Sequence, residues 1–302
     1  MFKNRRELVL NDSKANAGRV FDQLDVEEAT RSDYKSRIGM FLGFVGEQGF
    51  NRNSYLSFKR NLADRTDLTV STKNKYLASA RVFLKELNRQ GMLPADITQN
   101  IKGFSQNKKH KRDGLNDEEI IRLSEKMNRL SDNPENTRLK AILSLLTLQG
   151  LRQIEITRLD VSDIDLVGKK AFVRGKGSDD KEPIDLHPKT VNSLGSYLKT
   201  SKIRSGALFQ SNSNNSQNKR LTTRGLRLIV KEILNELGIE KTVHGFRHYF
   251  TTTLIKNYKG DLLEVATYTR HKGLEMLQVY NDAIKREADL PRYYNAFSGV
   301  SF

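Results

Sequence analysis

The stretch AILSLLTLQGLRQIEITRL, residues 141–159, decides the fold of the second half of the chain. Its first eight residues, Ala141–Leu148, are apolar enough to be buried on most sides, which predicts the central helix of a core. Gly150 can end that helix, so Arg152 is expected near the start of the next one. A guanidinium beside free helical N–H groups is well placed to bind phosphate oxygens. An arginine in this position is more often only a surface residue.

Downstream of this stretch the pattern changes to short apolar alternations between Val161 and Leu186. Turn signals separate them, Gly-Lys-Lys at 168–170 and Gly-Lys-Gly-Ser-Asp-Asp at 175–180, which predicts a small antiparallel sheet of two or three strands. The polar run 212–219 predicts a loop. Helical patterns return in three segments: Thr222–Leu237, His244–Asn257 and Asp261–Thr269.

Upstream of it, residues 105–114, SQNKKHKRDG, have the composition of a linker. A run of this kind is either a solvated loop or a segment that follows a phosphate backbone, in which case Lys108, Lys109, Lys111 and Arg112 contact DNA. The sequence LNDEE at 115–119 then predicts the capped, acid-rich first turn of a new helix. The second domain is therefore expected to start at Leu115.

The N-terminal part carries helical patterns of its own. Apolar residues spaced along one face predict a helix within Val26–Gln48 and another through Leu87, opened by Ser71 and Thr72 as caps. Shorter helices are expected over Ser54–Asp64 and Thr98–Phe104. We therefore expect a helical-bundle domain over residues 1–107, a basic linker over 108–114, and a mainly α domain with a small antiparallel sheet over 115–302.

Charge and composition narrow the class of partner. The 302 residues include 52 Lys and Arg against 36 Asp and Glu, a net charge of +16, which favours nucleic acid as the partner, ahead of an anionic membrane surface. Residues 1–114 hold 22 basic and 13 acidic residues, and the rest hold 30 and 23, so both parts are expected to touch it. The absence of cysteine excludes thiol nucleophiles and Cys-ligated zinc. No apolar run or signal sequence predicts a membrane or secreted protein, so a cytoplasmic location is expected, and a nucleoid-associated one if the partner is the DNA of a prokaryote.

The second domain also contains candidate chemical groups. In HGFRHYF, residues 244–250, His244 and Arg247 lie on one helical face. His248 lies one turn from His244, so a two-histidine metal site is an alternative, although no third ligand follows at a suitable spacing. His271 and Tyr280 follow, nine residues apart. Taken alone, a tyrosine on an apolar-patterned helix is normally a core residue.

In chain order, G-L-R-x-x-E at 150–155, the G-K-G turn at 175–177, H-x-x-R at 244–247, and His271 with Tyr280 nine residues later resemble the tyrosine recombinase (phage integrase) family. The N-terminal helical bundle, residues 1–107, resembles the family's DNA-binding core-binding domain in size and placement. No additional arm-binding domain is expected ahead of it, which is similar to the architecture of Xer-like recombinases and short integrases. The segment 272–279, KGLEMLQV, lacks the small hydroxyl residues that members often carry there, which leaves the substrate subfamily open. The resemblance implies a catalytic set that consists of Arg152, Lys176, His244, Arg247, His271 and Tyr280, with Glu155 as a supporting residue.

The implied reaction needs neither metal nor cofactor. A phosphotyrosine ester at Tyr280 stores the energy of the broken strand, so no nucleotide-binding loop is required. Arg152, Arg247 and His271 would neutralise transition-state charge as metal ions do elsewhere. His244 would accept or relay the tyrosyl proton, and Lys176 would protonate the leaving 5′ oxygen, with Lys181 or His271 as the next candidates.

The resemblance further implies a covalent 3′-phosphotyrosyl intermediate, a Holliday junction and a homotetramer on paired double-stranded DNA sites, formed from monomers in solution. The apolar tail beyond Asp289 is expected to dock on a neighbouring protomer, unless it folds back on its own domain. A non-catalytic DNA-binding protein and a type IB topoisomerase are the two competing functions. The target sequence, the biological role and any accessory proteins cannot be read from the sequence.

Overall fold

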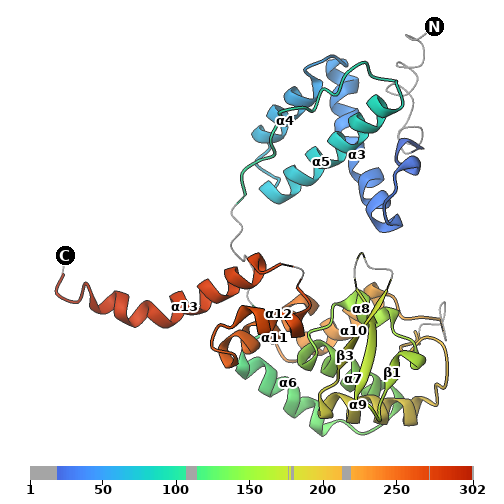
Figure 1. Ribbon diagram of the computed structural model, residues 1–302, viewed down its shortest axis with the longest axis vertical. Helices are drawn as coiled ribbons and strands as arrows, with labels where there is room; N and C mark the ends of the chain where they lie inside the picture. The colour runs from blue at the N-terminus through green and yellow to red at the C-terminus, as the bar shows by residue number, and fades with distance from the viewer. Residues whose placement is uncertain are drawn as a thin grey trace. The chain divides into compact units, whose positions relative to one another are not determined.

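The computed structural model describes residues 19–106, 114–175, 177, 180–212, 219–271 and 273–300 (Figure 1). The chain divides into two units, Met1–Lys108 and Lys109–Phe302. Helices and strands carry the labels of Figure 1. The expected basic linker lies outside the described residues except for Gly114, and so do its four proposed DNA contacts, Lys108, Lys109, Lys111 and Arg112.

Within residues 19–106, three α-helices and a short 3-10 helix are described in the first unit: η1 (Phe21–Gln23), α3 (Glu28–Gln48), α4 (Ser54–Asp64) and α5 (Val70–Arg89). Their buried faces meet in an aromatic core, where the rings of Phe41 and Phe58 lie edge to face at 5.1 Å. Gly49 ends α3 with a φ of 75°, a conformation that glycine adopts without a steric penalty. The expected helical bundle is therefore present.

Two local predictions for the first unit are wrong. The cap of α5 is Thr69, whose extended backbone lets its hydroxyl oxygen accept from the N–H of Thr72 at 3.2 Å, so Ser71 and Thr72 lie inside the first turn. The segment 98–104 forms a turn followed by extended chain instead of a helix. The Asp96 carboxylate binds the N–H and hydroxyl of Thr98, and Asn100 is left-handed at φ 60°, which stops helix propagation.

Eight helices are described in the second unit: α6 (Asp117–Arg129), α7 (Pro134–Leu148), α8 (Gln153–Arg158), α9 (Pro188–Ser201), α10 (Thr223–Glu236), α11 (Val243–Asn257), α12 (Leu262–Thr269) and α13 (Glu275–Asn295). The first begins with the predicted cap, because Asn116 and Glu119 bind each other's backbone N–H groups at 2.8 Å. As expected, α7 is the central helix: its residues 141–146 are buried, and it packs against α9 and α11.

A three-stranded antiparallel sheet forms where the alternating pattern predicts it, after the 3-10 helix η2 (Val161–Asp163). The strand order is β1 (Ile164–Asp165), β2 (Lys170–Arg174), β3 (Lys181–Asp185). Arg174 and Lys181 form the last pair between β2 and β3. Gly175 and Gly177 of the expected G-K-G turn lie between these two strands, and Lys176 is outside the described residues.

The sequence analysis did not predict α9. The signal was present, because Pro188 occupies its first turn and Val191, Leu194 and Leu198 follow at helical spacing. Leu194 and Tyr197 bury this face against α7. The mainly helical fold with a small antiparallel sheet is nevertheless confirmed. Across the described residues, no helix has both the length and the apolar character needed to cross a membrane.

Candidate active site

Gly150 produces the sharp turn that separates α7 from Arg152. Its φ is +57°, and a Cβ at this position would lie 2.2 Å from the ring of Phe250, so both backbone conformation and space require glycine. The turn makes Arg152 the residue that immediately precedes α8. The sequence-based placement of Arg152 is thus the observed one.

Glu155 anchors Arg152 twice. One carboxylate oxygen accepts from the Arg152 backbone N–H at 2.7 Å, and the other accepts from its guanidinium at 2.9 Å. The Glu155 side chain is only 1% exposed, whereas that of Arg152 is 33% exposed. The guanidinium is therefore held from the protein side while part of it remains open to a ligand.

Arg247 joins the two turns that carry Arg152 and His271. It is buried in α11 and donates to the carbonyl oxygens of Gly150 and Thr269, both at 2.6 Å. Burial, reinforced by the positive charge of Arg152, lowers the pKa of Arg247 to about 10. The group still carries its charge at neutral pH, so it places a fixed cation in a dry part of the site.

The hydrogen bonds of His271 determine its tautomer. Its Nδ1 lies 2.7 Å from the hydroxyl oxygen of Thr269, and that hydroxyl donates its one proton to the carbonyl of Val265 at 2.9 Å. Nδ1 must therefore be the donor. Burial, followed by the charge of Arg247, lowers the pKa of His271 to about 4. At neutral pH the imidazole is uncharged, and a bound phosphate would be needed to favour its second proton.

This pKa predicts a pH dependence of folding. Between pH 6.5, the ordinary pKa of histidine, and pH 4 the unfolded chain binds a proton at His271 that the folded chain does not bind. The free energy of unfolding should therefore decrease as the pH is lowered through this window. His271 contributes at most about 1.4 kcal/mol per pH unit to this decrease. Urea unfolding at several pH values should show a shallower decline for His271→Gln, and exposed His187→Gln serves as the control. Equal slopes for wild type and His271→Gln would contradict the assignment.

Tyr280 lies near the start of α13 and contacts His248 directly. The ring is 8% exposed, and its hydroxyl lies 2.6 Å from Nδ1 of His248. Burial raises the pKa of Tyr280 to about 12, although Arg247 acts in the opposite direction. The phenol is therefore protonated at neutral pH and needs a proton acceptor before it can act as a nucleophile.

The proton acceptor next to Tyr280 differs from the one that the sequence suggested. The residue at the hydroxyl is His248, and His244 lies behind it, with the two imidazole rings edge to face at 4.6 Å. Both lie on α11 with Arg247. The hydroxyl of Tyr280 thus meets His248, and His244 contacts the imidazole ring of His248 rather than the tyrosine hydroxyl.

A hollow of about 640 Å³ opens beside Tyr280. Side chains of α11 and α13 line it, together with the segment 114–117 that leads into α6. Tyr280 and His248 lie in its wall, so the buried hydroxyl is adjacent to a space that a ligand or a rearranged helix can enter.

Lys176, the predicted general acid, lies outside the described residues. The neighbouring Gly175 is positioned by Arg158, which donates to its carbonyl oxygen at 3.0 Å. The alternative candidate Lys181 is already engaged, because its ammonium lies 2.5 Å from the buried carboxylate of Asp163. This pairing makes the Lys181 ammonium less available as a proton donor.

The structure adds two residues that the motifs did not single out as catalytic, His248 and Arg270. Arg270 donates to Glu155 at 2.8 Å from a position 115 residues further along the chain. His248 lies one helical turn from His244 in the sequence, and the spacing alone indicates it only as a candidate metal ligand. Among the described residues, no group of three or more histidine or acidic side chains is arranged to hold a metal ion.

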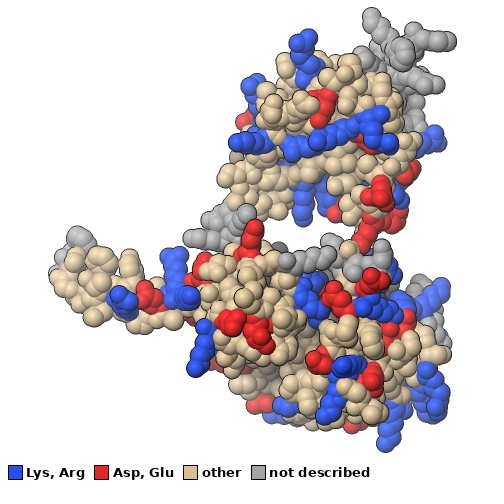
Figure 2. Space-filling model, viewed as in Figure 1, with Lys and Arg blue, Asp and Glu red and all other residues tan. Residues whose placement is uncertain are grey.

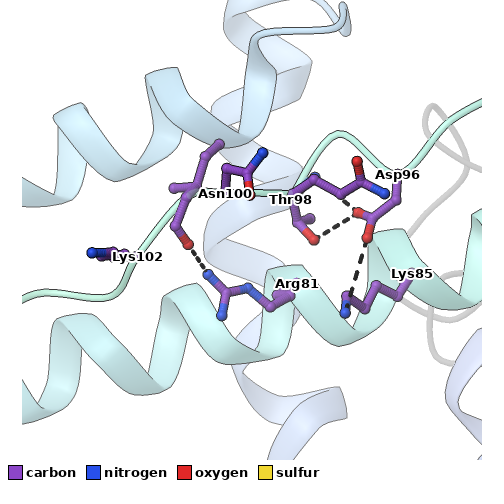
Figure 3. Close-up of a pocket in the computed structure, with 8 residues that line it drawn as sticks. Arg81, Lys85, Asp96, Thr98, Asn100 and Lys102 are labelled. Atoms are coloured by element: carbon purple, nitrogen blue, oxygen red, sulfur yellow. Dashed lines mark hydrogen bonds and ion pairs between the residues drawn. The ribbon is translucent and has the colours of Figure 1, made fainter.

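A second hollow, of about 540 Å³, lies in the first unit between α5 and the segment 96–102 (Figure 3). Arg81 donates to the carbonyl of Ile101 there, and Lys85 lies 3.9 Å from Asp96. Lys59 and Lys73 lie nearby over the ring of Phe104. Together with Lys102 these cations form what we call the basic strip: Lys59, Lys73, Arg81, Lys85 and Lys102. Figure 2 shows Lys and Arg side chains in a row across one face of this unit.

Known proteins are similar to this chain in sequence and in fold. The model of the phage integrase family matches residues 114–287. Tyrosine recombinase XerD of Oceanobacillus iheyensis is 30% identical over 288 residues, which cover 89% of this chain and 93% of that protein. The XerH site-specific recombinase bound to palindromic difH in a post-cleavage complex has a TM-score of 0.74 at 18% identity, covering 93% of this chain and 84% of that one. A lambda integrase tetramer bound to a Holliday junction has a TM-score of 0.64 at 12% identity, covering 88% and 75%. The chain therefore belongs to the phage integrase family and is a tyrosine site-specific recombinase.

Proposed function

We propose that Tyr280 cuts DNA by direct attack on a phosphodiester. The Tyr280 oxygen forms a bond to phosphorus, the bond to the 5′ oxygen breaks, and a 3′-phosphotyrosyl enzyme and a free 5′ hydroxyl result. The same hydroxyl, or one from a partner strand, reverses the step, and exchange between two sites passes through a Holliday junction. The observation that carries the proposal is one cluster in which Tyr280, a histidine at its hydroxyl and the buried Arg247 come together.

The remaining residues of the cluster support this chemistry. Arg152 and Arg247 offer guanidinium groups to the non-bridging oxygens, and His271 donates from its second nitrogen once the phosphate favours its protonation. The tyrosyl proton passes to His248, with His244 behind it. Lys176 supplies the proton that the leaving 5′ oxygen takes up. Glu155 fixes Arg152 and does not itself contact DNA.

DNA is held from both units in this proposal. The basic strip of the first unit offers clustered cations to the phosphate backbone, and Lys108, Lys109, Lys111 and Arg112 extend the contact along the linker between 1–107 and 115–302. The overall charge of +16 is consistent with a polyanion as the partner. We expect monomers to fill the half-sites and a tetramer to form on paired sites. The lambda integrase structure is named as a tetramer bound to a Holliday junction, which supports this expectation.

Trapping on a nicked suicide substrate tests the chemistry. The nick lets the fragment that carries the 5′ hydroxyl diffuse away, so the wild-type enzyme should accumulate a covalent adduct on the 3′ side. Excess EDTA should leave the yield unchanged, because guanidinium groups take the place of a metal. A strong loss in EDTA would revive the His244 and His248 metal site. Recombination of a plasmid with two target sites then separates this enzyme from a topoisomerase, which needs only one site.

The role of Lys176 is tested by changing the leaving group. Lys176→Ala should cleave ordinary DNA slowly, on the order of 10²- to 10⁴-fold below wild type, as is typical when general acid catalysis is lost. A 5′-bridging phosphorothiolate should largely restore the rate, because a thiolate leaves without a proton. Lys181→Ala is the matched control. The phosphorothiolate should not raise its cleavage rate relative to that of wild type. Recovery by Lys181→Ala alone would transfer the role to Lys181.

A further inference from the structure

Arg270 occupies a backbone position that favours glycine. It immediately follows α12 with φ 53° and ψ 44°, in the left-handed region. An L side chain is strained in this region, and glycine is the usual residue where a helix ends in this way. Backbone conformation therefore gives no reason for an arginine here, and its side-chain contacts must supply one.

The side chain of Arg270 is directed into the active site. It is 12% exposed, and one guanidinium nitrogen donates to a carboxylate oxygen of Glu155 at 2.8 Å. That same oxygen accepts the backbone N–H of Arg152, and the second oxygen accepts the Arg152 guanidinium. A single buried carboxylate is thus shared between two arginines that are far apart in the sequence.

Sharing the carboxylate changes the charge offered to a ligand. Glu155 paired with Arg152 alone would be a neutral pair, and the buried carboxylate would draw that guanidinium towards itself. With Arg270 on its other side, the group of three carries one net positive charge, and Arg152 is less tightly bound to Glu155. Arg270 also precedes His271, so the ion pair fixes the distance between the two turns that present Arg152 and His271.

We propose that Arg270 is a positioning residue of the recombination site, which acts through Glu155 to hold Arg152 and His271 in register around the scissile phosphate. The inference rests on the proposed function of Tyr280. It requires Arg270 to act on the rate of strand cleavage without contacting DNA itself.

Replacement by glycine separates the side chain from the backbone. Arg270→Gly relieves the left-handed strain but removes one cation from buried Glu155. The protein should still fold, because Glu155 keeps its bonds to the backbone N–H and the guanidinium of Arg152. Adduct formation on the suicide substrate, measured as a single-turnover rate at saturating enzyme, should fall on the order of 10²-fold, as small displacements in an active site typically cause. Half-site affinity should be unchanged. Lys202→Gly is the matched control, because Lys202 follows α9 at φ 58° and is exposed.

Two further variants distinguish positioning from other roles. Arg270→Lys should recover most of the rate, because only one guanidinium nitrogen contacts Glu155 and an ammonium can replace it. In a double-mutant cycle, Arg270→Gly should add little to the defect of Glu155→Gln, because both break the same link. Wild-type cleavage by Arg270→Gly, no recovery by Arg270→Lys, or fully additive defects would each overturn the proposal. A wild-type enzyme that forms no adduct would instead refute the chemistry assigned to Tyr280.

Discussion

Tyr280→Phe is expected to bind its DNA site with wild-type affinity and to form no covalent adduct. The substitution removes only the nucleophilic oxygen and leaves Arg152, Arg247 and His271 in place. It also leaves Nδ1 of His248 without its 2.6 Å partner, which should cost about 1 kcal/mol of folding stability, too little to unfold the chain. Adduct formation on the suicide substrate and mobility shift on an intact site measure the two properties separately.

The matched control for this variant is Tyr268→Phe. Tyr268 is 46% exposed on α12, and its ring lies against that of Tyr258. It should lose neither binding nor adduct formation. An undiminished adduct from Tyr280→Phe would show that another residue is the nucleophile and would remove the basis of the proposed function.

Truncation after Asp289 is expected to abolish recombination of paired sites while the protein still folds. The apolar cluster around Tyr280 is built by Ile255, Val265 and Leu277, with Ile284 as the last residue of α13 that packs on it. Beyond this point α13 extends away from the rest of its unit in Figure 1. The rings of Tyr293, Tyr294 and Phe297 are 56–63% exposed. Their removal therefore deletes no buried side chain of this protomer.

The tail is a surface that a neighbouring protomer can bury. An exposed aromatic group of this kind is unusual on an isolated protein and typical of a contact site. We therefore expect the truncated enzyme to fill one half-site normally, to lose cooperative filling of the second, and to fail in strand exchange more severely than in cleavage. Mobility shift on half-sites and full sites, followed by plasmid recombination, measures these steps in order.

A full-length variant guards against effects of chain length. Replacement of Tyr293, Tyr294 and Phe297 by serine keeps the chain length but removes the three exposed rings, and it should reproduce the truncation. Val167→Ser, which changes a residue 95% exposed outside the tail, is the control and should recombine normally. Normal recombination by the truncated protein, or its unfolding, would assign the tail to its own protomer instead.

Local patterns predicted most of the elements because they depend on neighbours in the sequence. The spacing of apolar residues gave the bounds of α4 and located α3, α7 and α11 closely, since a buried helical face repeats every three or four residues. The failures were also local. The expected helix over 98–104 does not form, because the side chain of Asp96 binds Thr98 in a turn. Helix α9 was not predicted, although its apolar residues are regularly spaced.

The sequence by itself determined the family, the order of the motifs and the candidate nucleophile Tyr280, because these depend only on residue type and spacing. Only the tertiary structure decided which groups touch. Helical spacing places His244, Arg247 and His248 near one another on α11, but the approach of α13 decides that His248 meets the Tyr280 hydroxyl. The link from Arg270 to Glu155 spans 115 residues and has no local signature. Contacts between distant segments are set by how helices pack, and no periodicity along the chain records that packing.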